Sequence, residues 1–234
     1  MFSQQPVLGI VGNHDVSMTG RLTESDSLAV LVEAGCFRIV SETEPWVGKL
    51  GSVPVLIGGS SYGENIPRCF DKVRFGASDE TKVIWLTHHD VRFRGYEENG
   101  RFGPFAIDGV DLVVNGHIHR PLESARSGET LWLNPGNITR ISRGEASMRE
   151  PQVMKVLLSS LGWTVETEVV PHAPFADVFY EVEEGEEVEF GESQFIHGLE
   201  MLEKIRTEDG TGLLDFIERN REALGDERVF EEIR

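Results

Sequence analysis

Short apolar runs divide the first part of the chain into segments of strand length. Residues 7–11, 83–86 and 111–114 are almost wholly apolar, and each gives way to glycine, asparagine or histidine within two residues. A continuous apolar run of roughly four to eight residues that ends in turn-forming residues is typical of a buried strand. We therefore expect three interior strands, each of which leads polar residues into a loop.

Other patterns fill the segments between these runs. Residues 26–34 are predicted to form a helix, with Thr23 and Ser25 as candidate caps and Gly35 in the position that closes a helix. Antiparallel strands are expected at residues 37–40, 46–49 and 53–57, and hairpins at 122–133 and 153–169. This mixture predicts an α/β (α+β) fold of two packed sheets with flanking helices.

The character of the sequence changes after residue 172. Residues 173–234 contain 19 acidic and 6 basic residues, and they account for most of the net charge of -18. Apolar residues recur at helical spacing in residues 194–206 and 212–223. We expect a domain at residues 1–172, followed by an acidic linker and a small helical appendage that packs on the domain or docks a partner.

Composition limits the cellular setting. The longest apolar runs are far shorter than the ~20 residues of a membrane-spanning helix, so no membrane association is expected. Cys36 and Cys69 are too few for a disulfide scaffold and form no Cys-x-x-Cys motif. They are predicted to be reduced core thiols of a cytoplasmic protein.

Five of the seven histidines lie in three blocks that follow the predicted interior strands. These are residues 12–15 (Gly-Asn-His-Asp), 88–90 (His-His-Asp) and 116–119 (Gly-His-Ile-His). A single histidine is most often an ordinary core residue, and we assign His172 and His197 to that class. Neutral imidazole and an Asn carbonyl are ligands for manganese, iron or zinc, so three blocks in this order favour a metal site. Ligation and a supporting or substrate contact both stay open for His89.

The three blocks resemble the last three motifs of the calcineurin-like metallophosphoesterases. Members carry Gly-Asn-His-Asp, a His after a strand, and Gly-His-x-His, and residues 134–137 (Asn-Pro-Gly-Asn) are similar to their Asn-Pro-Gly-Ser turn. The resemblance covers residues 7 to about 170. It implies a calcineurin-like two-sheet sandwich and two divalent metal ions, with Mn²⁺ as the first choice and Fe²⁺ or Zn²⁺ as alternatives.

Site roles follow from the resemblance residue by residue. Asn13, His88 and His117 would bind one metal, and His119 would bind the other. His14 would be the catalytic histidine, oriented by Asp15.

Two family motifs, Asp-x-His and Gly-Asp-x-x-Asp, do not occur in this sequence. They supply an Asp, a His and the Asp that bridges the two metals, so we expect an N-terminally incomplete domain and weak metal binding. Three explanations stay open: a fragment, one half of a split enzyme whose partner polypeptide supplies the missing ligands, or a catalytically incomplete interaction module. Residues 7–11 have the profile of a strand buried on both faces, which favours the fragment.

The resemblance implies hydrolysis of phosphodiester or phosphomonoester bonds by metal-activated water. Arg94 and Arg140 are the candidate contacts to a phosphate-ester substrate, because guanidinium groups pair well with phosphate. A glycine-rich loop at residues 58–63 is expected to border the site. DNA is one candidate substrate, since residues 169–175 and the Tyr62-Gly63 loop are loosely similar to the DNA-repair exonuclease branch. His88-His89 is more similar to phosphodiesterases of small substrates.

Overall fold

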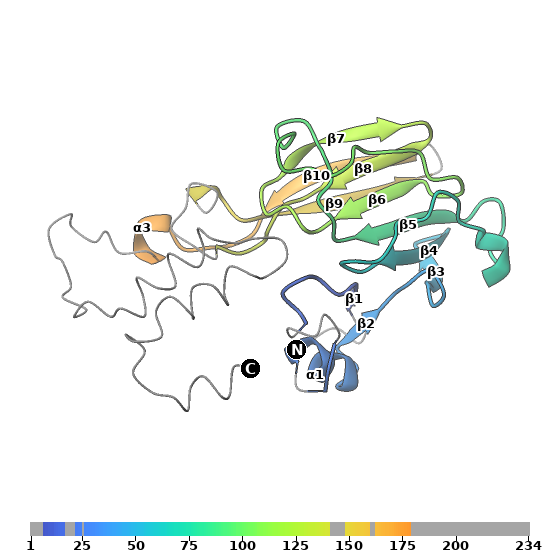
Figure 1. Ribbon diagram of the computed structural model, residues 1–234, viewed down its shortest axis with the longest axis horizontal. Helices are drawn as coiled ribbons and strands as arrows, with labels where there is room; N and C mark the ends of the chain where they lie inside the picture. Colours follow the sequence, from blue (N-terminus) through green and yellow to red (C-terminus); the bar gives the residue numbers. More distant parts are fainter. Residues whose placement is uncertain (1–6, 17–21, 25, 141–147, 160–161, 179–234) are drawn as a thin grey trace, which may run out of the picture. The chain divides into compact units, whose positions relative to one another are not determined.

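Four parallel strands form the centre of the structure, a computed structural model that describes residues 7–16, 22–24, 26–140, 148–159 and 162–178. The strands are β4 (Val53–Ser60), β5 (Lys82–Thr87), β6 (Leu112–Asn115) and β8 (Thr130–Asn134). Antiparallel β3 (Trp46–Leu50) and β7 (Leu122–Ser127) complete a six-stranded sheet of order β3-β4-β5-β6-β8-β7 (Figure 1). Because the four inner strands are parallel, their carboxyl ends lie at the same edge of the sheet.

Each face of this sheet has its own apolar core. One face is covered by the hairpin of β9 (Gln152–Ser159) and β10 (Gly162–Val169), which lies across the sheet in Figure 1. Buried residues of that core are Val55, Ile84, Leu112 and Leu133. The second core packs Trp85 and Trp132 under the long connections, including the 3₁₀ helix η1 (Lys72–Phe75), and both indole N–H groups find acceptors there.

A smaller element group precedes the sheet. Strand β1 (Val7–Gly9) pairs in parallel with β2 (Phe37–Ile39), and helix α1 (Ser27–Glu33) connects them. The prediction that residues 7–11 form a strand buried on both faces is wrong, because β1 ends at Gly9, Val7 is 62% exposed and residues 8–11 are half-buried. The predicted antiparallel pairing is confirmed for β3 and β4, whereas β2 pairs with β1 instead.

Several local predictions are confirmed. Both hairpins form, and Gly35 follows α1 with a φ of 68°, in the left-handed region that glycine tolerates. Thr23 does not cap the helix, because its hydroxyl donates to Asp26 Oδ2 at 2.9 Å, and Ser25 lies outside the described residues.

The mixed α/β class predicted from the sequence is therefore confirmed. Two other expectations fare differently. Cys36 and Cys69 are free thiols, as expected, but both are exposed rather than in the core. The helices predicted at residues 194–206 and 212–223 lie outside the described residues, which end with the short helix α3 (Phe175–Val178).

Candidate metal centre

Three polar loops meet at the carboxyl edge of the sheet. His88 directly follows β5, and His117 follows β6 by two residues. The loop after β1 is joined to the end of β4, because Tyr62 N donates to Val11 O at 2.9 Å. This places Asn13 Oδ1 2.9 Å from His88 Nε2, and the His88 and His117 ring centroids lie 4.8 Å apart. Asn13, His88 and His117 thus form a compact group, which we call the inner cluster.

Buried amides hold the His117 loop in place. Asn134, at the end of β8, donates to Ile118 O at 2.9 Å and to Arg120 O at 2.8 Å. Its Oδ1 accepts from Asn115 Nδ2 at 2.9 Å, and both asparagines are fully buried. Gly136 follows with a φ of 79°, and a Cβ there would lie 2.6 Å from Pro121 N. The turn at residues 134–137 therefore acts as a clamp on the histidine loop.

A carboxylate lies behind His117. Asp90 Oδ1 is 2.9 Å from His117 Nε2, and both side chains are 19% exposed. The other ring nitrogen, His117 Nδ1, is buried and has no hydrogen-bond partner among the described residues. A buried polar atom without a partner is costly, so the unpartnered His117 Nδ1 points to a ligand at that atom.

Burial disfavours the charged form of two histidines, His88 and His119. Desolvation, followed by the neighbouring His117, lowers the pKa of His88 to about 4. Desolvation is also the main cause that lowers the pKa of His119, with His117 and His14 adding to it. A neutral imidazole has the lone pair that a metal ion requires, so His88 is uncharged and able to act as a ligand over the physiological range.

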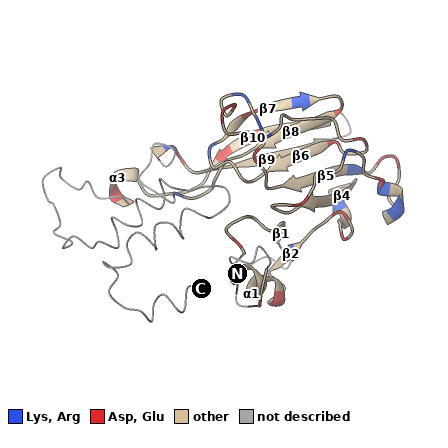
Figure 2. Ribbon diagram, viewed as in Figure 1, with Lys and Arg blue, Asp and Glu red and all other residues tan. Residues whose placement is uncertain are grey.

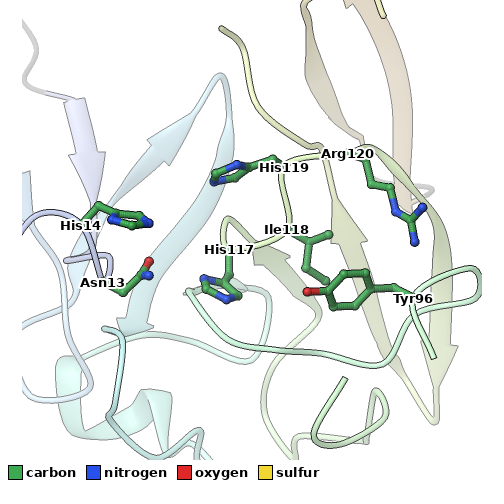
Figure 3. Close-up of a pocket in the computed structure, with 7 residues that line it drawn as sticks. All are labelled: Asn13, His14, Tyr96, His117, Ile118, His119 and Arg120. Atoms are coloured by element: carbon green, nitrogen blue, oxygen red, sulfur yellow. The ribbon is translucent and has the colours of Figure 1, made fainter. Parts of the chain in front are cut away.

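A pocket of about 330 Å³ opens beside the inner cluster. Figure 3 shows Asn13 and His14 on one side, Tyr96 and Arg120 on the other, and His117 and His119 between them. The Tyr62 ring, from the predicted bordering loop, stacks on His117 with centroids 5.8 Å apart. His14 and His119 are exposed, and we call them the outer pair.

The predicted substrate arginines lie elsewhere. Arg94 pairs with Glu123 at 3.4 Å, and Arg140 donates to Ala173 O at 2.6 Å and packs over the Phe175 ring. Neither lines the pocket, where Arg120 stands instead, 5.6 Å from the centroid of the Tyr96 ring.

Two other predicted residues bind backbone groups or nearby side chains. Asp15 Oδ2 accepts from Gly12 N at 2.7 Å and so stabilises the turn that carries His14. His89 uses both ring nitrogens, one with Thr87 Oγ1 and one with Glu64 O. Since Glu64 O only accepts, His89 Nε2 carries the proton, and no lone pair is left for a metal ion.

The inner cluster fits one divalent ion. Among the described residues no three His, Cys, Asp or Glu side chains gather as a metal-binding group, so the set depends on the Asn13 amide oxygen. Two imidazole rings and one carbonyl oxygen are suitable ligand types for Mn²⁺, Fe²⁺ or Zn²⁺. His117 Nδ1 is unpartnered, and an ion in the cluster would replace the hydrogen bond that His88 Nε2 donates to Asn13 Oδ1. The outer pair does not fit a second ion, because in the described part of the chain no carboxylate accompanies His119 at the pocket wall.

Sequence reasoning gave no role to Asp90 and favoured Arg94 and Arg140 over Arg120 as substrate contacts. Asp90 belongs to the 88–90 block and Arg120 follows the last histidine, so their positions were visible as motif neighbours. What the sequence lacked was the conformation of residues 90–102, which turns Asp90 under His117.

Within the described residues, the positions of Lys and Arg along the ribbon are spread over several elements, among them η1 and β7 (Figure 2). Within the described ranges, the helices are too short or too polar to cross a membrane.

Comparison with protein-family models and with curated proteins finds no match for this chain.

Proposed function

We propose that the chain is a metal-dependent phosphoesterase of calcineurin-like fold that hydrolyses phosphodiester or phosphomonoester bonds. The observation that carries the proposal is the inner cluster, in which Asn13, His88 and His117 converge from three separate strand ends. The adjoining pocket supports it further, since Arg120 offers a fixed positive charge opposite the histidines.

In this proposal the inner cluster holds one divalent ion through the Asn13 carbonyl and the two imidazoles. Such an ion, when bound, polarises phosphoryl oxygens and lowers the pKa of a coordinated water to ~7. Arg120 binds a non-bridging phosphate oxygen from the opposite wall. His14 donates a proton or hydrogen bond to the leaving-group oxygen, and Tyr62 and Ile118 shield the inner cluster from bulk water.

Hydrolysis of bis(p-nitrophenyl) phosphate in the presence of Mn²⁺ tests this function. The expected result is metal-dependent turnover that His117→Ala removes. His172→Ala is the matched control, because His172 hydrogen-bonds the Val170 carbonyl far along the chain from the cluster. No turnover with Mn²⁺, Fe²⁺ or Zn²⁺, or equal turnover in both variants, would overturn the proposal.

A catalytically incomplete interaction module is the second candidate. It is favoured by one observation, namely that His119 has no carboxylate beside it among the residues that line the pocket. Under this alternative, His14→Ala and His117→Ala leave the cellular role intact. A split enzyme gives a third pattern, in which turnover appears only when a partner polypeptide is added.

DNA is the narrower substrate proposal. Phosphate contacts are strongest at low salt, so electrophoretic mobility shift of single- and double-stranded DNA at low ionic strength is the direct measurement. If neither DNA form is shifted, the nuclease interpretation is removed. Small phosphodiesters then remain as the candidate substrates.

A further inference from the structure

The Asp90–His117 pair has the geometry by which a carboxylate prepares a histidine for a metal ion. We infer that Asp90 is a positioning residue that fixes His117 with its proton on Nε2 and thereby strengthens metal binding at Nδ1. The inference rests on the metal site of the proposed function. It addresses an obvious weakness of that site, whose three donors are all neutral.

The first step concerns the proton. Asp90 Oδ1 lies 2.9 Å from His117 Nε2, and a carboxylate can only accept in such a bond. His117 Nε2 must therefore carry the hydrogen. In the neutral ring this leaves the lone pair on Nδ1, the buried atom that has no partner among the described residues.

The second step concerns charge. A carboxylate behind a ligating imidazole raises the basicity of the ligand and offsets part of the charge of the ion. Asp90 is 19% exposed, so its charge is only partly screened by water. Among the described residues, no other carboxylate forms an ion pair with a histidine ring of the inner cluster.

The third step concerns rigidity. Arg101 N donates to Asp90 O at 2.8 Å, and Val91 and Phe102 form a bridge beside it. Arg101 Nε also lies 3.4 Å from Asp90 Oδ2, and the Tyr62 ring stacks on His117. Because the backbone bonds hold Asp90 in place, its side chain can be changed without loss of the loop.

The test uses the full chain and Mn²⁺ alone. Titration calorimetry should give an affinity about 10–100-fold weaker for Asp90→Asn and Asp90→Ala than for the wild type. Arg101→Gln is the matched control, because it removes a contact to the other carboxylate oxygen and leaves the His117 bond. Its affinity should stay within about threefold of the wild type, since exposed ion pairs contribute little.

A second readout does not depend on metal or activity. Nitrogen-15 NMR of the metal-free wild type should show His117 with its proton on Nε2, and Asp90→Ala should lose this preference. Thermal unfolding checks that each variant is folded. Equal Mn²⁺ affinities, no Mn²⁺ binding by the wild type, or a wild-type proton on Nδ1 would overturn the inference. Weaker binding together with absent turnover would overturn the proposed hydrolase and leave the role of Asp90 standing.

Discussion

The inner cluster and the outer pair show how differently one structure can support neighbouring histidines. The His88 and His117 rings lie in contact with each other. His88 also contacts Asn13, and His117 contacts Asp90. The outer pair is exposed and lacks a carboxylate at the pocket wall among the described residues. A site holds its ligands in the geometry needed for binding when buried neighbours fix their rotamers. The inner cluster is therefore preorganised for one ion, while the outer pair is suited to contacting substrate.

The largest expected effect separates these two regions by metal affinity. His88→Ala removes one of three donors, so Mn²⁺ affinity should fall by at least about 100-fold. This exceeds the loss that follows from changing a residue that only hydrogen-bonds a ligand. His119→Ala should change the affinity of the inner site by less than about threefold. Calorimetric titration of both variants measures this directly. Comparable losses in the two variants, or two tightly bound ions in the wild type, would contradict the assignment of a single site at the inner cluster.

Much of the inner cluster could be predicted from the sequence, because apolar runs that end in Asn or His identify strands and their carboxyl ends. His88 and His117 follow β5 and β6, adjacent parallel strands, so their proximity follows from the order of the sheet. The pairing of β2 with β1 could not be predicted, since an alternating pattern specifies a half-buried strand and not its partner. The positions of Arg94 and Arg140 outside the pocket could not be predicted for a related reason.

Those arginines depend on loop conformation rather than on strand order. Arg94 and Arg140 follow the motifs at plausible distances, yet long side chains on loops pair with whatever acceptor the loop reaches. Arg94 pairs with Glu123, and Arg140 donates to the Ala173 carbonyl. Arg120 lines the pocket, and its guanidinium donates to Gly95 O and packs over the Tyr96 ring, while Asn134 binds its carbonyl. These contacts join residues that only the fold brings together.

The second prediction concerns catalysis by the outer pair. His14→Ala should lower kcat for bis(p-nitrophenyl) phosphate by about 10²–10⁴-fold, the usual loss for a general acid. Because His14 lies outside the inner cluster, Mn²⁺ affinity should not change. Steady-state kinetics and calorimetry on the same preparation separate the two quantities. A parallel fall in Mn²⁺ affinity would instead assign His14 to the metal site.

A third prediction tests the clamp on the His117 loop. Asn134→Ala leaves the Ile118 and Arg120 carbonyls without their donor, and each buried unpaired group costs roughly 1–3 kcal/mol. The free energy of unfolding from urea titration should fall by about that amount or more. Asn137→Ala is the control on the same turn, because among the described residues its side chain bonds the exposed Thr139 alone. Equal losses in the two variants would show that the buried amide has no special role.

The smallest expected effect is a pH dependence that marks the inner cluster. The pKa of His88 is lowered from 6.5 to about 4 by burial and by His117. Between these two values the unfolded chain binds a proton at His88 and the folded chain does not. The free energy of unfolding should therefore decrease as the pH falls from 6.5 to about 4, and this contribution is constant above and below that window. His88→Gln should reduce this decrease and leave the part that comes from His89 and His119, whose pKa values burial also lowers, while His172→Gln should keep all of it. Urea titrations of the metal-free protein across this range measure the difference, and the same pH dependence in wild type and His88→Gln would show that His88 is not held neutral by its surroundings.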